Sequence, residues 1–481
     1  MTGMSEQLPR RTKIVATVGP ASWDPATLRA LIEAGADVLR LNFSHSDEEK
    51  HAQIVRDIRA ASLEVGREVA ILGDLPGPKL RVGDIPDGVV RLVPGSTVTL
   101  VHGEGSGTAE RIPIPRAEII ESLGEGAIVY MADGSIRLKV TGQVEDGVEA
   151  LVEVGGPLSS NKGLNLPGVD TGIEAVSEAD LRWIDFSVEQ ELDLLAVSFV
   201  KSAADLVPVA ERLESLGSEM PVIAKIEKPE ATDREALDGI LESVGGGIMI
   251  ARGDLGIEVP IAEVPSLQKR LISQAGEWSK LSITATQMLA SMVSATRPTR
   301  AEVTDVATAI SDGTDAVMLS EETAVGSNPV DAVRTMDEIA RATEPGLPYW
   351  EWLLNRTSQH GMDVSESVTQ SAVISAYRLD LTSIVVPTAS GRTASVVAAH
   401  RPRVPILAVT HSVQTQRRLR VYFGVEPVQH TPTNEIRDLL YECADVAVRF
   451  GAAKSGDLIA IVASLSDLGL GTNLFEVHKV P

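Results

Sequence analysis

The sequence predicts an α/β protein whose centre is a closed (β/α)8 barrel. Short apolar or β-branched runs alternate with amphipathic segments of helical length along most of the chain. Helix signals separate the strands, as in DPATLRALIEAG, which has an Asp cap, a Pro in the first turn and a Gly stop. Eight strands that alternate with helices favour a closed barrel over an open sheet. The predicted strands span residues 12–18, 38–43, 69–74, 194–200, 221–227, 247–252, 281–286 and 315–320.

Two further domains are expected beside the barrel. From about residue 82 the composition shifts to Val, Gly, Thr and Asp, with short alternating runs such as STVTLVHG and SIRLKVTGQV. A structureless loop of that length is improbable, so residues 82–155 are predicted to form an inserted small all-β domain. A new alternation of strands and helices predicts a separate α/β domain at 345–481. The barrel then comprises residues 8–81 and 156–344.

Composition limits the classes of partner, and 43% hydrophobic with 23% charged residues indicates a globular chain. The net charge of −24 opposes binding to nucleic acid or anionic membranes, although solubility alone also explains it. An anionic substrate therefore needs a local group of Arg, Lys or metal. The single cysteine, Cys443, excludes an intramolecular disulfide framework and is expected to be a small buried residue. The segment MTGMSEQLPRR has no apolar signal core and no apolar run approaches a membrane span, so a cytoplasmic protein is expected.

The strand at 221–227 carries the strongest chemical signal. Lys225 and Glu227 project to the same face because side chains alternate along a strand, and Asp254 arrives at the end of the next strand. Ligands of parallel α/β folds gather at this rim. Two carboxylates suit a hard divalent cation, and the lysine suits an anionic group held on that cation. A single Lys–Glu pair that neutralises itself is the simpler alternative, unless other strand ends carry a similar pattern.

Other strand ends do carry polar groups. In VLRLNFSH, alternation sends Arg40, Asn42 and Ser44 to one face, which packing does not explain. Thr286 offers a hydroxyl after the seventh strand, although threonine favours strands in any case. These positions support a site at the rim of the barrel.

Two loops also carry phosphate-binding chemistry. After Asp74, the turn LPGPKLR brings Lys79 and Arg81 to the entrance of the inserted domain, although a turn rich in Pro and Gly also suits any hinge. In the C-terminal domain, TASGRT from Thr388 to Thr393 joins a strand to a helix with hydroxyls, a Gly and an Arg. This segment is either a phosphate-binding nest or an ordinary N-cap.

A series of short motifs runs along nearly the whole chain. They are TKIVATVGPAS, LNFSH, GPKLR, NKGLNLPG, AVSFV, AKIEKPE, ARGDLGIE, ATQML, RPTRAEVTDVA and DGTDAVMLSEETA, with ASGRTA, RPRVPILAVT and GTNLFEVHKV in the last domain. In this order they resemble the pyruvate kinase family. The resemblance implies a TIM barrel with a small β-barrel lid between its third strand and third helix, and a C-terminal regulatory domain. It also implies phosphoryl transfer from phosphoenolpyruvate to ADP, giving pyruvate and ATP in the last step of glycolysis, by an allosteric homotetramer.

The resemblance further implies roles for individual residues. Glu227 and Asp254 would hold Mg2+, or Mn2+ in its place, and the main chain of Gly253 and Asp254 would bind the substrate carboxylate. Lys225 would stabilise the phosphoryl group in flight, and Thr286 would order a water that protonates the enolate. Arg40 and Arg81 would assist Lys225. The implied nucleotide contacts are Asn42, His45, Arg81, Asp133 and Lys162.

The family resemblance also bears on a monovalent ion and an effector. Asn42, Ser44, Asp74 and Leu75 resemble the ligands of K+, but members that need K+ have a Thr where Leu75 stands and a Glu where Lys79 stands. The Lys79 ammonium can replace the charge of the ion, so activity without K+ is expected and the ion site is expected to be vacant.

In the family that this chain resembles, the equivalent of the TASGRT loop binds an effector phosphate, which implicates Thr388, Ser390, Gly391, Arg392 and Thr393. The shorter lid leaves the nucleotide contacts less defined.

Two other functions compete with the kinase. A barrel aldolase or lyase could bind pyruvate or phosphoenolpyruvate through Mg2+ on Glu227 and Asp254, but it has no need of the insertion or the C-terminal domain. A non-catalytic metabolite-binding regulator would tolerate loss of Lys225, Arg40 or Thr286, and all of them are present. Formation of pyruvate that depends on ADP would distinguish the kinase from both.

Overall fold

A closed barrel of eight parallel strands lies at the centre of the computed structural model. The structure describes residues 10–86, 88–103, 105–132, 134–169, 171–355, 363–431, 433, 436–464 and 471–481. Around the barrel the strands follow the order β1-β16-β15-β14-β13-β12-β3-β2, which confirms the predicted fold class. The strands are β1 (Lys13–Val18), β2 (Val38–Asn42), β3 (Ala70–Asp74), β12 (Leu194–Val197), β13 (Val222–Ile226), β14 (Gly247–Ala251), β15 (Leu281–Ala285) and β16 (Ala316–Leu319).

All eight predicted strands are present, each shorter than predicted by one to three residues. At several of these ends the backbone turns away from the sheet. Phe199 and Thr286 follow β12 and β15 with left-handed φ values of 56° and 69°. Arg252, predicted as the end of a strand, instead begins helix α7.

Helices cover the outside of the barrel. Helix α1 begins after Asp24, whose side chain accepts a hydrogen bond from the Thr27 amide, and ends at Gly35 with φ 115°, as its sequence signals predict. The helices are α1 (Pro25–Ala34), α2 (Glu48–Val65), α4 (Glu178–Glu189), α5 (Val207–Ser215), α6 (Arg234–Ser243), α7 (Arg252–Glu258), α8 (Val264–Glu277), α9 (Arg300–Ser311), α10 (Glu321–Ala324) and α11 (Pro329–Thr343).

Alternation along the strands separates two apolar layers. On β13, Ile223 packs with Val15 and Leu72 inside the barrel. Ala224 and Ile226 point outward into the larger core beneath the helices. Lys225 therefore shares the inward face with Ile223, which directs its ammonium to the carboxyl end of the barrel.

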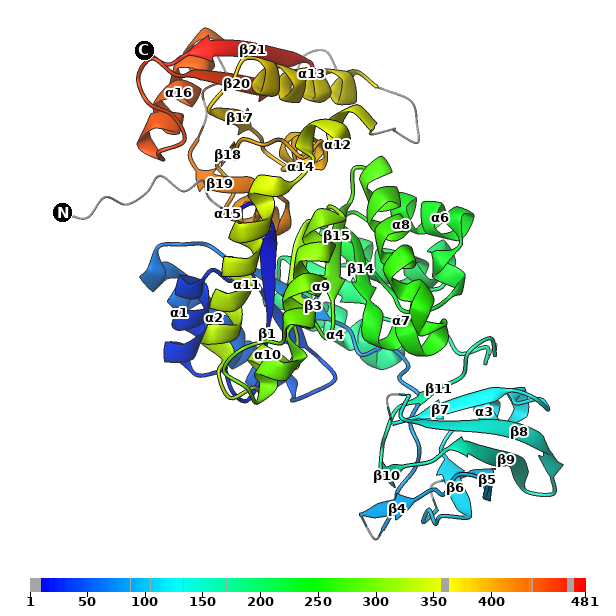
Figure 1. Ribbon diagram of the computed structural model, residues 1–481. Coiled ribbons are helices and arrows are strands. Elements are labelled where there is room, and N and C mark those ends of the chain that lie inside the picture. Colours follow the sequence, from blue (N-terminus) through cyan, green and yellow to red (C-terminus); the bar gives the residue numbers. More distant parts are fainter. Residues whose placement is uncertain are drawn as a thin grey trace.

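A β-rich body is inserted between β3 and α4. Its six-stranded sheet has the order β11-β7-β8-β9-β5-β6, and a two-stranded ribbon pairs β10 with β4. Figure 1 shows this body at the far end of the barrel from the C-terminal domain, beyond α7. The elements are β4 (Val89–Arg91), β5 (Thr97–His102), β6 (Arg111–Ile114), α3 (Ala117–Ser122), β7 (Ile128–Met131), β8 (Ile136–Val144), β9 (Gly147–Val154), β10 (Pro157–Ser159) and β11 (Leu164–Asn165).

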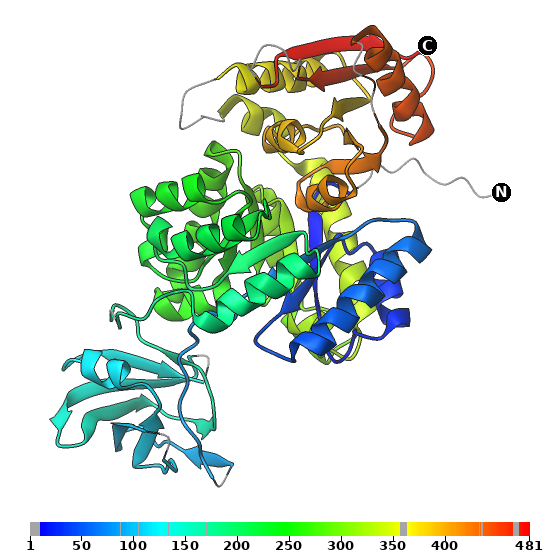
Figure 2. The same ribbon diagram turned by 180° about the vertical axis from the view of Figure 1, so that it is seen from behind.

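The C-terminal domain contains a five-stranded sheet of order β19-β18-β17-β20-β21, in which only β21 is antiparallel. Figure 2 shows the sheet from behind, with helices on both of its faces. The elements are α12 (Tyr349–Asn355), α13 (Val364–Arg378), β17 (Ser383–Pro387), α14 (Arg392–Ala399), β18 (Ile406–Thr410), α15 (Val413–Arg418), β19 (Val425–Gln429), α16 (Ile436–Arg449), β20 (Leu458–Ala463) and β21 (Leu474–Lys479). The sequence did not predict β19, whose Glu426 and Pro427 suit an edge position.

Two further expectations can be compared with this fold. Cys443 on α16 is buried, as predicted, and burial raises the pKa of its thiol to about 12. No helix within the described ranges is both long and apolar enough to cross a membrane.

Buried ion pairs join the C-terminal domain to the amino ends of the barrel strands. Arg401 donates two hydrogen bonds to the carboxylate of Asp315, at 2.9 and 2.7 Å. Lys13 of β1 lies 3.1 Å from Glu426 of β19 and donates to the Val425 carbonyl at 2.8 Å. These pairs hold the sheet of the C-terminal domain against the floor of the barrel.

Asp37, which precedes β2, is a buried anchor of this floor. Its carboxylate accepts hydrogen bonds from Arg10 and from the Ile14 amide, both at 2.9 Å, and from Arg67. Burial alone would raise the pKa of Asp37, but the two guanidiniums outweigh it and hold the pKa below the ordinary value of 3.8. The carboxylate therefore stabilises the fold at neutral pH, and this stabilisation is lost as the pH falls below about 4.

Replacing Asp37 with Asn should lower the apparent thermal midpoint strongly at pH 7. The expected loss is about 3 to 5 kcal/mol, because two buried guanidiniums lose their anionic partner. The difference from wild type should shrink as the pH is lowered from about 5 to about 3, since Asp37 of the unfolded wild-type chain takes up a proton in this range while the native carboxylate stays ionised. Thermal melts across this pH range test the prediction, with Asp331→Asn as the control for loss of an exposed ion pair. A difference that does not change with pH would contradict the assignment.

Candidate active site

A buried carboxylate lies between two cations at the carboxyl ends of β2, β3 and β13. Asp74 is the last residue of β3, and its side chain is only 1% exposed. Arg40 donates to Asp74 Oδ2 at 2.6 Å, and Lys225 Nζ donates to Asp74 Oδ1 at 3.1 Å. Thr17 of β1 accepts a further hydrogen bond from Arg40 at 3.0 Å. Arg40, Asp74 and Lys225 thus come from three different strands and meet at the rim of the barrel.

Glu227 completes this cluster from the residue after β13. Its Oε1 lies 3.1 Å from Lys225 Nζ, and its Oε2 accepts a hydrogen bond from the Phe199 amide at 2.8 Å. The side chain is 2% exposed. The predicted shared face of Lys225 and Glu227 is therefore correct. The ion pair considered as the simpler alternative also exists, but it is part of a larger charged group.

The carboxylates of this cluster outnumber its cations. Burial raises the pKa of Glu227, and the nearby charge of Asp254 adds to this effect while Lys225 opposes it. Burial would lower the pKa of Lys225, but Asp74 and Glu227 outweigh it and keep the amine protonated. Burial would also raise the pKa of Asp74, yet Arg40 and Lys225 hold it low. Three carboxyl groups therefore share this cluster with two cations.

The chemistry of these donors fits a divalent cation. Glu227 and Asp254 present carboxylate oxygens, which hard cations such as Mg2+ prefer. Across the described ranges, no cluster of three or more His, Cys, Asp or Glu could hold a metal by itself. A Mg2+ ion here would therefore take its remaining ligands from substrate and water, as this ion commonly does.

The corner after β14 is tied to the end of β15. The Gly253 amide donates to Thr286 Oγ1 at 2.7 Å, and that hydroxyl donates to the Ala285 carbonyl at 2.7 Å. Arg252 fixes the same corner through two hydrogen bonds to Asp305, at 2.7 and 2.8 Å. The Gly253 amide, expected to bind a substrate carboxylate, must release Thr286 before it can do so.

The loop after β2 forms a tight turn at the rim. Asn42 Oδ1 accepts a hydrogen bond from the Ser44 amide at 3.1 Å, and Ser44 and His45 are exposed. The buried His51 of α2 lies 2.7 Å from the His45 carbonyl and so holds the loop from below. The exposed side chains can meet a ligand that approaches from solvent.

The residues at the root of the inserted body lie apart from the buried cluster. Arg81 donates to the Asn161 carbonyl at 2.9 Å, which ties the two connecting segments together. Lys79 and Lys162 are exposed. Lys79 and Asp254 both line a narrow cleft between the inserted body and the barrel. Asp133, predicted to contact nucleotide, lies outside the described residues.

The four predicted ligands of a monovalent ion have partners in this structure. Both oxygens of Asp74 are engaged by cations, and its carbonyl accepts from the Phe43 amide at 3.1 Å. The Leu75 carbonyl accepts a hydrogen bond from the Ser198 hydroxyl at 2.7 Å. The exposed Lys79 ammonium belongs to the neighbouring cleft.

Sequence reasoning missed Thr17, Ser198 and the Phe199 amide. Each of these groups bonds directly to a member of the charged cluster. The available signal was a polar residue at the carboxyl end of a barrel strand, which Ser198 in AVSFV satisfies. A main-chain donor such as the Phe199 amide has no sequence signal of its own.

The predicted effector loop follows β17 as expected. Thr388 Oγ1 accepts from the Gly391 amide at 3.0 Å, and Gly391 has a left-handed φ of 89°. Thr393 shares a hydrogen bond of 2.8 Å with Thr472. Ser390, Gly391 and Arg392 line a cavity of about 990 Å3 together with Lys280 and Arg418. Burial and the charge of Arg392 lower the pKa of Lys280. The same cavity is also lined by the acidic residues Glu219, Glu277, Asp363 and Glu366.

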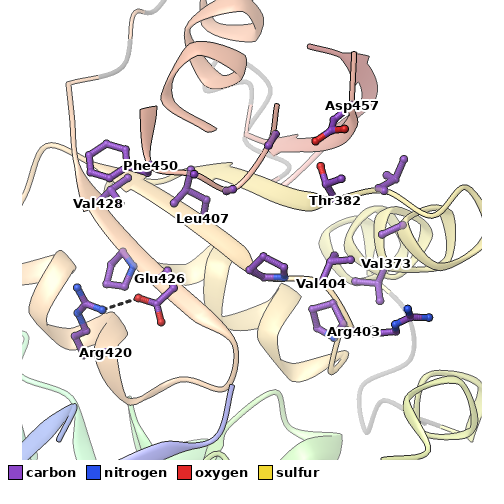
Figure 3. A pocket seen from close by; sticks show the side chains of 18 of the residues that line it. Val373, Thr382, Arg403, Val404, Leu407, Arg420, Glu426, Val428, Phe450 and Asp457 are labelled. Atoms are coloured by element: carbon purple, nitrogen blue, oxygen red, sulfur yellow. Dashed lines mark hydrogen bonds and ion pairs between the residues drawn. The ribbon is translucent and has the colours of Figure 1, made fainter. Parts of the chain in front are cut away.

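A larger cavity, of about 1170 Å3, lies between the C-terminal sheet and α2 of the barrel. Figure 3 shows its wall, where Arg420 and Glu426 form an ion pair of 2.7 Å below Leu407, Val428 and Phe450. The predicted site residues are not among those that line it. Convergent buried charge, and not cavity size, therefore identifies the candidate active site.

Comparison with known proteins places both the barrel and the C-terminal domain in one family. Residues 9–333 match the family model described as "Pyruvate kinase, barrel domain", and residues 366–478 match "Pyruvate kinase, alpha/beta domain". The chain is 42% identical over 475 residues to a pyruvate kinase of Geobacillus stearothermophilus. It is 40% identical to those of Sporosarcina psychrophila and Bacillus licheniformis. Each alignment covers 98% of this chain and 80% of the relative.

Gly77 packs against the residues that follow β12 at this site, so it should not tolerate a side chain. It has φ 62°, and a Cβ added there would lie 2.9 Å from both Ser198 Cβ and Phe199 Cδ2. Gly217 has a similar φ of 63° with nothing within 4 Å of an added Cβ. Gly217→Ala should thus cost about 1 to 2 kcal/mol from backbone strain alone. Gly77→Ala should cost about 1 to 3 kcal/mol more from overpacking, as apparent unfolding midpoints will show. Equal losses would contradict the packing at Gly77.

Proposed function

Since the chain belongs to the pyruvate kinase family and is therefore a phosphotransferase, we propose that it carries out the Mg2+-dependent reaction of phosphoenolpyruvate with ADP. The products are pyruvate and ATP, and the proposed location is the cytoplasm. The observation that carries the proposal is the Lys225 ammonium beside Glu227 and Asp254 at the rim of the barrel. Mn2+ is a plausible replacement for Mg2+, because both take oxygen ligands.

Binding and charge stabilisation are the main tasks of the site. Glu227 and Asp254 are the residues that would hold the metal. The bound ion would supply positive charge to the carboxylate and phosphoryl oxygens of the substrate. The phosphoryl group carries negative charge on all its oxygens during transfer, so fixed cations stabilise the transition state more than the ground state. Lys225 supplies that fixed charge, and Arg40 holds the neighbouring Asp74 in place.

The remaining roles rest on geometry at the edge of the site. Thr286 joins the end of β15 to Gly253, where its hydroxyl can order the water that protonates the enolate. Arg81 and Lys162 occupy the root of the inserted body, from which they can reach a nucleotide. Asn42 and His45 would border the nucleotide phosphates from the exposed turn after β2.

The test is a coupled assay of pyruvate formation from phosphoenolpyruvate. We expect turnover only when both ADP and a divalent cation are present. Aldol cleavage, or binding of substrate without turnover, would instead support a lyase or a non-catalytic regulator. The proposed homotetramer is tested by light scattering on the same preparation.

Lys225→Met should reduce kcat by about three decades. A charge pair at about 4 Å is worth about 4 kcal/mol at an effective dielectric near 20, and about 1.4 kcal/mol corresponds to a tenfold change in rate. Lys269→Met, at an exposed position of α8, is the matched control and should stay within twofold of wild type. A loss of less than tenfold in Lys225→Met would remove Lys225 from its proposed role.

We propose that activity does not require K+, because the Lys79 ammonium at the turn after β3 can replace the charge of the ion. Rates in Tris or sodium buffer should stay within a few-fold of those in K+. Lys79→Glu should lower the rate in K+-free buffer and make it respond to added K+. A fall of tenfold or more for wild type without K+ would contradict the proposal.

We also propose that a phosphorylated effector binds the loop at Thr388–Thr393. The support is the loop after β17, where Arg392 stands beside the Gly391 amide, in a cavity that holds both basic and acidic side chains. Titration of sugar phosphates and AMP should change the kinetics of wild type. Arg392→Ala should reduce that response at least tenfold in effector concentration, with basal activity retained. Arg449→Ala on α16 is the control for loss of an exposed arginine in the same domain. An unchanged response in Arg392→Ala would eliminate the site.

A further inference from the structure

The two residues after β12 contact the charged cluster from a side that the proposed mechanism does not use. Ser198 is 2% exposed, and its hydroxyl accepts a hydrogen bond from Lys225 Nζ at 2.7 Å. The same hydroxyl donates to the Leu75 carbonyl at 2.7 Å. A hydroxyl has one proton, and the carbonyl takes it. Its lone pairs are therefore left to face the ammonium.

Ser198 is the neutral member of the group that holds Lys225. The ammonium has three N–H donors, and it lies at 3.1 Å from Asp74, 3.1 Å from Glu227 and 2.7 Å from Ser198. The two carboxylates hold Nζ but also offset its positive charge. The hydroxyl holds it without adding a negative charge, so more of the positive potential of the lysine remains for an anionic group.

Phe199 holds the other half of the same ion pair. Its amide donates to Glu227 Oε2 at 2.8 Å. Adjacent residues therefore fix both partners, Lys225 through a side chain and Glu227 through the main chain. This places the Oε1 edge of Glu227 toward Lys225 and defines the distance between the two groups.

The backbone at this corner is strained. Phe199 has a φ of 56°, a conformation that costs a residue with a Cβ free energy in isolation. Gly77 packs against the corner, where any larger residue would collide with Ser198 and Phe199. The strained residue is the one whose amide reaches Glu227, and its neighbour is the one whose hydroxyl reaches Lys225. Strain at this position is thus linked to the geometry of the site.

We infer that Ser198 and Phe199 form a positioning corner that fixes Lys225 and Glu227 for the transfer step. Ser198 acts through Lys225 and does not touch the substrate, so it is a positioning residue. The inference rests on the proposed function. It adds a role for the AVSFV segment, and it makes the hydroxyl of Ser198 a determinant of kcat.

The test compares Ser198→Ala with Ser187→Ala. Ser187 on α4 is fully buried, and its hydroxyl also donates to a carbonyl, that of Trp183, at 2.7 Å. Both variants lose one buried hydroxyl, and Ser198→Ala should lower the thermal midpoint more, because Ser198 has a second hydrogen bond, to the charged Lys225. Ser198→Ala should lower kcat about 10- to 100-fold, because a hydrogen bond to a charged group is lost. KM for both substrates should change less than threefold, and Ser187→Ala should keep the wild-type kcat within twofold.

A second measurement separates positioning of Lys225 from metal binding. Mn2+ affinity, measured by electron paramagnetic resonance without substrate, should be the same within twofold in Ser198→Ala and wild type, since the Phe199 amide still holds Glu227. A tenfold weaker affinity would overturn the inference, because Ser198 would then act on the metal site. If wild type is active and the two serine variants have equal kcat, the inference is also overturned. If wild type is inert, the proposed function itself is overturned.

Discussion

The carboxylate of Asp74 is shared between Arg40 and Lys225, and the site depends on this sharing. A carboxylate that is 1% exposed would be costly to bury alone, so each of its oxygens must meet a cation. The two cations come from different strands, and only closure of the barrel brings their ends to one rim. Removal of any member would leave another charge buried without its partner, which makes the cluster a single unit.

The acidity of the cluster bears on the proposed reaction with an anionic substrate. A chain of net charge −24 repels phosphorylated molecules at long range. In the proposed function, Glu227 and Asp254 would hold a divalent cation, and Lys225 remains protonated beside them. The bound cation and the lysine would then present positive charge within an acidic surface. The strained corners at Phe199 and Thr286 supply the donors and hydroxyls that orient it.

The C-terminal domain is joined to the opposite end of the same strands. Its pairs with Asp315 and Lys13 reach the amino ends of β16 and β1, while the charged cluster lies at the carboxyl ends. A change in the C-terminal domain can therefore reach the site through rigid strands of only a few residues. The effector proposed for the C-terminal domain would act on the barrel through this junction.

The sequence by itself determined the eight strands, the insertion after the third, and the shared face of Lys225 and Glu227, because local periodicity and alternation set them. It could not show where strands end, since Phe199 and Thr286 are residue types that favour strands while their backbone turns out of the sheet. Nor could it predict β19, whose pairing depends on β18. Only the tertiary structure joined Ser198 to Lys225 and engaged the Gly253 amide with Thr286. Such contacts depend on distances between residues far apart in the chain, which no local pattern encodes.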